Sequence, residues 1–141
     1  MKKAICLVLI FGLLFRFCGC QKYNGDVSEV KTRKVESKLY SQEDIDAAIA
    51  VIIEEFRSWQ GCKLTEIYYA GDETNQQENA YYIKGGVYPN AQEMIVLESS
   101  FEVDESGGDG SLNPNTTYNH WKWLLVREDG GTWEHVDHGY G

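Results

Sequence analysis

Histidine and carboxylate side chains near the C-terminus are the residues best suited to chemistry. His135 and His138 bound the stretch His-Val-Asp-His, and His120 lies on what reads as the neighbouring strand. Imidazole nitrogens bind zinc and act as general bases. On a regular strand, residues i and i+3 point to opposite faces, so His135 and His138 are not expected to share an ion. His135 and Asp137 would share a face and, with Trp133, could line a pocket, although we favour a partly exposed strand end.

Aromatic side chains are dense for one small domain, with four Trp, nine Tyr and five Phe. Trp121 and Trp123 alternate along one predicted strand and could reach the same pocket as Trp133. On a sheet, such residues are more often core and cross-strand pairs than a platform for a ligand. A row with its polar tips facing outward would still suit a peptide or a glycan, so this second interpretation stays open.

The stretch Asp104–Asn115 is rich in oxygen atoms that could bind a cation. Asp104, Ser106, Asp109 and Asn113 are candidate calcium ligands, because calcium prefers oxygen ligands. The spacing does not fit an EF-hand loop, which needs Gly at its sixth position and Glu at its twelfth. Three glycines and an Asn-Pro-Asn sequence suit successive turns instead. We therefore predict a long turn, with no metal site and no cofactor.

Residues 1–20 read as a lipoprotein signal peptide. Lys2 and Lys3 precede the apolar run Ala4–Phe15, which is too short to span a bilayer and has the length of a secretory signal. The sequence Phe-Cys-Gly-Cys then ends at Cys20, and a small residue before a cysteine resembles the lipobox of bacterial lipoproteins. That resemblance implies that Cys20 is the lipidated mature N-terminus, anchored to the outer face of the cytoplasmic membrane at the cell surface. An ordinary signal peptide cut nearby is the alternative.

Charge and cysteine content narrow the possible partners. The chain carries a formal net charge of −9, and loss of residues 1–20 removes basic residues but no acidic ones. Such an acidic surface repels nucleic acid, which we exclude as a partner. After processing and lipidation, Cys62 is the one free thiol, so no intramolecular disulfide is expected. Cys62 opens an apolar strand and is predicted to be buried.

A flexible tether, 21–39, is predicted to join the anchor to a single domain, 40–141. The tether has few large apolar residues, and a short strand through its valines is the less favoured alternative. The domain opens with a predicted helix over Ser41–Trp59. Ser41 suits the N-cap, apolar residues recur at three- and four-residue spacing, and Gly61 ends the helix.

Strand patterns fill the rest of the domain. They are predicted at 62–69, 80–83, 93–104, 117–127 and 132–137, with a solvated loop at 71–79. Gly130 and Gly131 suit the turn of a closing hairpin. One helix followed by about five strands with hairpin-length connections predicts an α+β fold, in which the helix packs on a curved antiparallel sheet.

Two resemblances extend this interpretation. The order of elements over Ser41–Gly141, which closes with Trp-x-Trp-Leu-Leu-Val-Arg and Gly-Gly-x-Trp, resembles the cystatin-like fold and its nuclear-transport-factor-2-like relatives. This implies a curved sheet that wraps a helix and can leave a cone-shaped cavity. Ser106–Asn115, the Trp-x-Trp pair and Gly139-Tyr140 also resemble an uncharacterised family of secreted lipoproteins from Gram-positive bacteria. That resemblance implies location and fold, and it brings no catalytic residues.

We therefore predict a lipid-anchored, extracytoplasmic and non-catalytic binding module. Its partners would be the membrane, through the N-terminal lipid, and an unidentified protein, peptide or cell-wall ligand. The alternative is a small hydrolase or isomerase that uses His135 and Asp137 in a cone-shaped pocket. A buried His–carboxylate pair in a closed pocket would favour the enzyme, and a filled interior with exposed aromatic side chains would favour the binding module.

Overall fold

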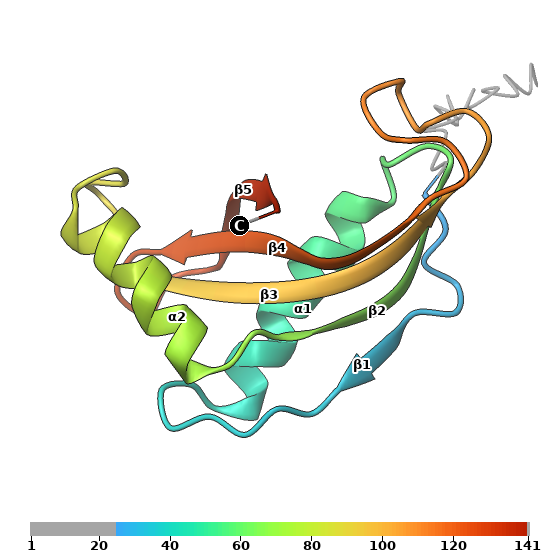
Figure 1. Cartoon of the computed structure of the whole chain (residues 1–141). Helices are drawn as coiled ribbons and strands as arrows, with labels where there is room; N and C mark the ends of the chain where they lie inside the picture. Colours follow the sequence, from blue (N-terminus) through green and yellow to red (C-terminus); the bar gives the residue numbers. More distant parts are fainter. Residues whose placement is uncertain (1–24, 141) are drawn as a thin grey trace, which may run out of the picture.

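The computed structural model describes residues 25–140, in which the chain forms one five-stranded sheet, two α-helices and a π-helical turn (Figure 1). The elements follow in the order β1 (Lys31–Arg33), α1 (Gln42–Phe56), β2 (Cys62–Tyr69), α2 (Asp72–Asn79), η1 (Ala80–Lys84), β3 (Glu93–Val103), β4 (Thr117–Arg127) and β5 (Glu134–Gly139). The strands lie side by side in chain order, and the sheet is open. The predicted α+β class is confirmed. The predicted signal peptide 1–20 and the lipidation site Cys20 lie outside the described residues.

The sheet is mixed because its first strand runs parallel to the second. Strands β2 to β5 pair antiparallel as predicted, whereas β1 pairs parallel with β2. Since β1 lies within 21–39, the prediction of a flexible tether is wrong from Gly25 onward. Val27, Val30 and Val35 pack against the core. These three valines are enough to hold the segment on the sheet, because the edge of β2 also offers backbone groups with which the segment pairs.

Helix α1 lies across one face of the sheet (Figure 1). At its start, the Oγ atom of Ser41 accepts a hydrogen bond from the backbone N–H of Asp44 at 3.1 Å, as an N-cap does. Its buried residues recur at helical spacing: Ile45, Ala48, Ile49, Ile52 and Phe56. Side chains of β2, β3 and β4, including Phe101, Trp123 and Leu125, pack against them and are almost completely buried. The space between α1 and the sheet is therefore filled.

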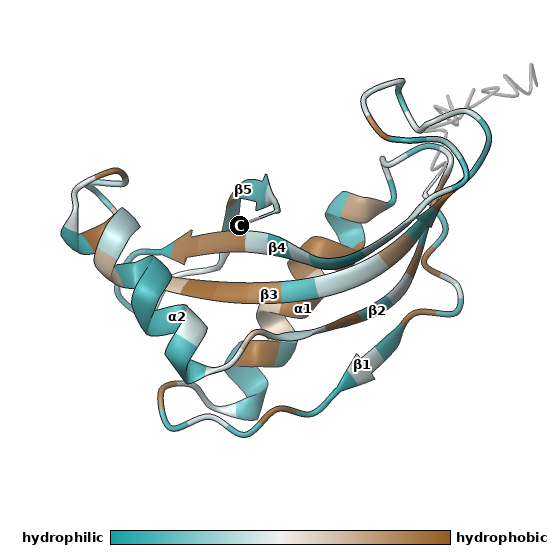
Figure 2. Cartoon of the chain, in the orientation of Figure 1, coloured by the Kyte–Doolittle hydropathy of each residue, from teal (hydrophilic) through white to brown (hydrophobic). Residues whose placement is uncertain are grey.

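The opposite face is covered at one end by α2 and η1, where sequence patterns gave the wrong elements. Residues 71–79 were predicted to be a loop and contain α2, and 80–83 were predicted to be a strand and form η1. Helix α2 contains no apolar residue, and Figure 2 shows it mainly in hydrophilic colours, so no apolar periodicity could indicate it. Apolar side chains of β3 and β4 pack with partly buried ones of η1: Met94, Val96, Leu124, Val126, Tyr82 and Ile83.

Asn75 fastens α2 to the sheet. Its side-chain amide donates to the carbonyl oxygen of Met94 at 3.0 Å and accepts a hydrogen bond from the backbone N–H of Val96 at 2.8 Å. Asn75 is 2% exposed, so both bonds are made away from water. The amide thus occupies the place of a neighbouring strand along this part of β3.

A β-bulge in β4 decides which aromatic residues share a face. Ser99 pairs with Trp121 and Phe101 pairs with Tyr118, so β4 has one residue more than β3 between these two pairs. His120 lies in this stretch with φ 56°, in the left-handed region. Because of the extra residue, Tyr118 and Trp121 both pack on the face that α1 covers.

Candidate ligand-binding site

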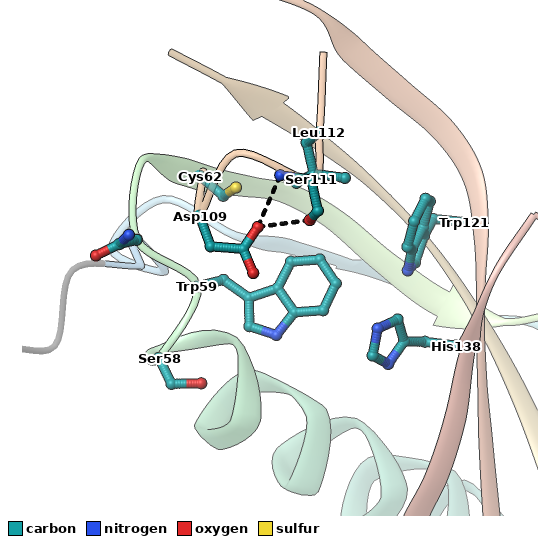
Figure 3. A pocket seen from close by; sticks show the side chains of 9 residues that line it. Ser58, Trp59, Cys62, Asp109, Ser111, Leu112, Trp121 and His138 are labelled. Atoms are coloured by element: carbon teal, nitrogen blue, oxygen red, sulfur yellow. Dashed lines mark hydrogen bonds between the residues drawn. The ribbon is translucent and has the colours of Figure 1, made fainter. Parts of the chain in front are cut away.

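A pocket of about 450 Å³ lies where the end of α1 meets the connection between β3 and β4. Its walls come from four segments of the chain: Ser58, Trp59, Gln60, Cys62, Asp109, Ser111, Leu112, Trp121 and His138. Figure 3 shows Trp59 on one side, Trp121 and His138 together on another, and Asp109 with Ser111 above them. The volume falls within the range of about 300–1,000 Å³ that is usual for small-molecule sites.

Trp59 is held by the turn that ends α1. Its backbone N–H donates to the carbonyl oxygen of Phe56 at 2.9 Å, and Gly61, with φ 71°, then directs the chain into β2. The Trp59 ring stacks on Phe56 with centroids 5.4 Å apart and meets Trp121 at 86° with centroids 6.0 Å apart. The helical pattern predicts Trp59 as the last residue of the helix and not as part of a pocket. Its position just before a helix-ending glycine was the available signal.

The connection between β3 and β4 packs directly on this turn. The backbone N–H of Asp104 donates to the carbonyl oxygen of Gly61 at 2.9 Å. A Cβ atom on Gly61 would lie 2.5 Å from the Oγ atom of Ser106. The loop is therefore docked on the end of α1, beside the pocket.

The carboxylates of this loop accept hydrogen bonds from backbone N–H groups of the same loop. Asp104 Oδ1 accepts from the backbone N–H of Ser106, and Asp109 Oδ1 accepts from that of Ser111, each at 2.9 Å. The backbone N–H of Asn113 donates to the Tyr118 hydroxyl at 3.0 Å, which ties the loop to the start of β4. Within residues 25–140, no group of three or more His, Cys, Asp or Glu side chains is placed to hold a metal ion.

The three predicted pocket tryptophans have different roles. Trp123 is fully buried and donates from Nε1 to Ser99 Oγ at 2.8 Å. Trp133 is 6% exposed and donates to the carbonyl oxygen of Asp44 at 3.1 Å. Both belong to the core. Trp121 does line the pocket, and its Nε1 is buried without a hydrogen-bond partner in the described part of the chain.

A second bulge, in β5, overturns the prediction for the histidines. The pairing of β4 with β5 leaves Val136 as an extra residue. His135 and His138 consequently share a face, with His138 Nδ1 3.2 Å from His135 Nε2. Asp137 lies on the other face of the strand, in a shallow pocket that Tyr82 also lines. The predicted row of Trp133, His135 and Asp137 is therefore not formed.

The His–carboxylate pair expected for catalysis is not assembled either. His135 Nε2 lies 3.2 Å from the backbone oxygen of Asp137, whose carboxylate accepts the backbone N–H of His138 at 2.8 Å. His120 does contact a carboxylate, Glu98 Oε2, at 3.1 Å, but its side chain is 77% exposed. That contact lies on the face of the sheet opposite to α1.

The lining of the pocket is acidic. Hydrogen bonds from the Ser111 side chain and backbone lower the pKa of Asp109, which is ionised at neutral pH. Partial burial and, next, the neighbouring His135 lower the pKa of His138, which is then neutral. Burial and nearby carboxylates raise the pKa of Cys62 to about 11, so its thiol stays protonated. With one carboxylate and no Lys or Arg among its lining residues, the pocket favours a neutral or cationic ligand.

Comparison with known proteins assigns no family. No protein-family model, no curated protein and no solved structure is significantly similar to the chain. None of the helices in residues 25–140 is long and apolar enough to cross a membrane.

Proposed function

We propose that the protein is a lipid-anchored, extracytoplasmic binding module that holds a small polar ligand in the pocket between Trp59, Trp121 and Asp109. The observation that carries this proposal is the buried Trp121 N–H without a partner at an aromatic pocket. A buried polar group is normally hydrogen-bonded, and leaving one unpaired costs about 1–3 kcal/mol. An acceptor atom on a bound ligand would satisfy it once the side chains that cover the N–H move aside.

The walls of the pocket favour a particular class of ligand. Trp59, stacked on Phe56, and Trp121, stacked on His138, offer apolar surface, while Ser58, Gln60 and Asp109 offer polar groups beside them. This combination suits a sugar ring or a peptide side chain with adjacent hydrogen-bonding groups. A neutral or cationic cell-wall fragment, glycan or peptide, is the ligand that we infer.

The anchor and the finer fold class belong to the same proposal. The Gly-Cys sequence that ends at Cys20 supports lipid attachment at the outer face of the membrane. A long helix packed across one face of a sheet supports a cystatin-like architecture. The parallel strand β1 and the additional helix α2 would be elaborations of that fold.

Saturation-transfer NMR with the detergent-solubilised full chain tests the binding function. The ligands are soluble peptidoglycan fragments whose carboxyl groups are amidated, so that they are neutral or cationic, offered as disaccharide-peptides, as free disaccharides and as free peptides. We expect saturable binding of at least one of them, and we expect Asp109→Lys to abolish it by reversing the charge of the lining. Asp129→Lys, an exposed residue of the β4–β5 turn, is the matched control and should bind as the wild type does. Absence of binding to all fragments, or equal binding by Asp109→Lys, would refute the proposal.

A further inference from the structure

The bulge at Val136 creates a pair of imidazoles that a regular strand would separate. Without the extra residue, His135 and His138 would point to opposite faces. With it, both rings lie on the face that α1 covers, and both pack against Trp123 with ring centroids 5.3 and 5.2 Å away. The two rings are nearly parallel to each other, at 23°.

Three potential electron-pair donors converge at this point. His138 Nδ1 lies 3.2 Å from His135 Nε2, which lies 3.2 Å from the backbone oxygen of Asp137. If both imidazoles are neutral, a proton on His135 Nε2 must be shared between the other two atoms. If the proton is on His138 Nδ1 instead, the lone pairs of His135 Nε2 and the Asp137 oxygen face each other. In either case, hydrogen bonding pairs these three atoms only in part.

A metal ion between the two imidazole nitrogens would accept a lone pair from each, with the Asp137 oxygen beside them. Zinc binds imidazole nitrogen at about 2.0–2.1 Å, and two such ligands separated by 3.2 Å subtend an angle of roughly 100° at the ion. Imidazole nitrogen suits Zn²⁺, Ni²⁺ and Cu²⁺ better than Mg²⁺ or Ca²⁺. The site is open to such ions, because the His138 side chain is exposed and that of His135 is half-buried.

Charges around the pair also suit a cation. The carboxylates of Asp137 and of Glu55, on the facing helix α1, act electrostatically on His138. Both are negatively charged when ionised and so attract a cation bound beside the two imidazoles.

We propose that His135 Nε2, His138 Nδ1 and the backbone oxygen of Asp137 bind one first-row transition-metal ion at the rim of the pocket. The site has two side-chain ligands, so it is weaker than a structural zinc site with four, and its remaining positions are open to water. Affinity follows the usual order for nitrogen ligands, with Cu²⁺ above Ni²⁺ and Zn²⁺.

The chain has three histidines, which allows a direct experiment. The imidazole signals of the full-length protein are followed by NMR at pH 7 while ZnCl₂ is added, and EDTA then reverses the titration. We expect the signals of His135 and His138 to shift together and saturate, while that of His120 stays in place. Equal shifts of all three, or no shift of His135 and His138, would overturn the proposal.

Substitutions separate this site from other metal-binding groups of the chain. His135→Ala and His138→Ala should each abolish saturable zinc binding, whereas His120→Ala, the matched control, should retain it. All cysteines are present in every variant, so a loss confined to the first two assigns the site to this pair. Retention of wild-type affinity in His138→Ala would refute the assignment, and circular dichroism checks that each variant is folded.

Discussion

Gly61 brings the end of α1 close to the β3–β4 loop, so that a larger residue would have to displace Ser106 and Asp104. Its φ is 71°, and an added Cβ would lie 2.5 Å from Ser106 Oγ and 2.8 Å from Asp104 Oδ1. Gly61→Ala should therefore lower the free energy of unfolding by about 2–4 kcal/mol, through left-handed backbone strain and displacement of the loop. Urea unfolding measures this change. The control is Gly110→Ala, where φ is 95° but no atom lies within 4 Å of the added carbon. Equal losses in both variants would show that the loop does not dock on Gly61.

His138 should make stability depend on pH in the mildly acidic range. Partial burial and the neighbouring His135 lower its pKa below the ordinary 6.5. The unfolded chain therefore binds the proton more readily, and the contribution of His138 is lost as pH falls from about 7 through its folded-state pKa. In EDTA, the urea midpoint of the wild type should fall between pH 7.5 and 5.5 by more than that of His138→Gln. An identical fall in both proteins would contradict the assigned direction.

The two bulges explain why the site could be predicted only in part. Trp121, His135 and His138 were recognised as candidate residues from their types. Their faces were assigned by strict alternation, and one extra residue at Val136 reverses that assignment for every residue beyond it. The bulge in β4 has no glycine to signal it, because His120 itself adopts the positive φ.

Helix α2 is held on the sheet by hydrogen bonds rather than by an apolar stripe. Asn75→Ala would leave the buried N–H of Val96 unpaired, which costs about 1–3 kcal/mol of unfolding free energy. Thermal or urea unfolding measures the loss. Gln76→Ala, an exposed amide in the next position, should change stability little. A smaller loss for Asn75→Ala than for Gln76→Ala would exclude this role.

Elements with a strong apolar pattern could be predicted, and those fastened by a few distant polar contacts could not. Strands β3 and β4 follow their predicted ranges closely, because their buried residues set the pattern. The segment before α1 is tied to α2 through Asp72, which accepts from Ser37 Oγ at 2.6 Å and from the Lys38 backbone N–H at 2.8 Å. Such contacts between residues far apart in sequence leave no periodic signal.

The whole molecule is proposed to act from a lipid anchor, and this can be tested separately from binding. Cys20→Ala should move the protein from the membrane fraction to the soluble fraction and abolish labelling with a fatty-acid analogue. Cys18→Ala is the matched control, because it alters the neighbouring cysteine and should leave labelling in place. Equal labelling of wild type and Cys20→Ala would end the lipoprotein claim.

The indole N–H of Trp121 offers the most direct test of the pocket. The ¹⁵N-labelled protein has four indole signals, one for each Trp. When a peptidoglycan fragment that binds in saturation-transfer NMR is added, the signal of Trp121 should move and saturate with the ligand. That of Trp133 should stay in place, because its N–H already donates to the Asp44 carbonyl oxygen. A Trp121 signal that does not move while the ligand saturates the protein would contradict binding in this pocket.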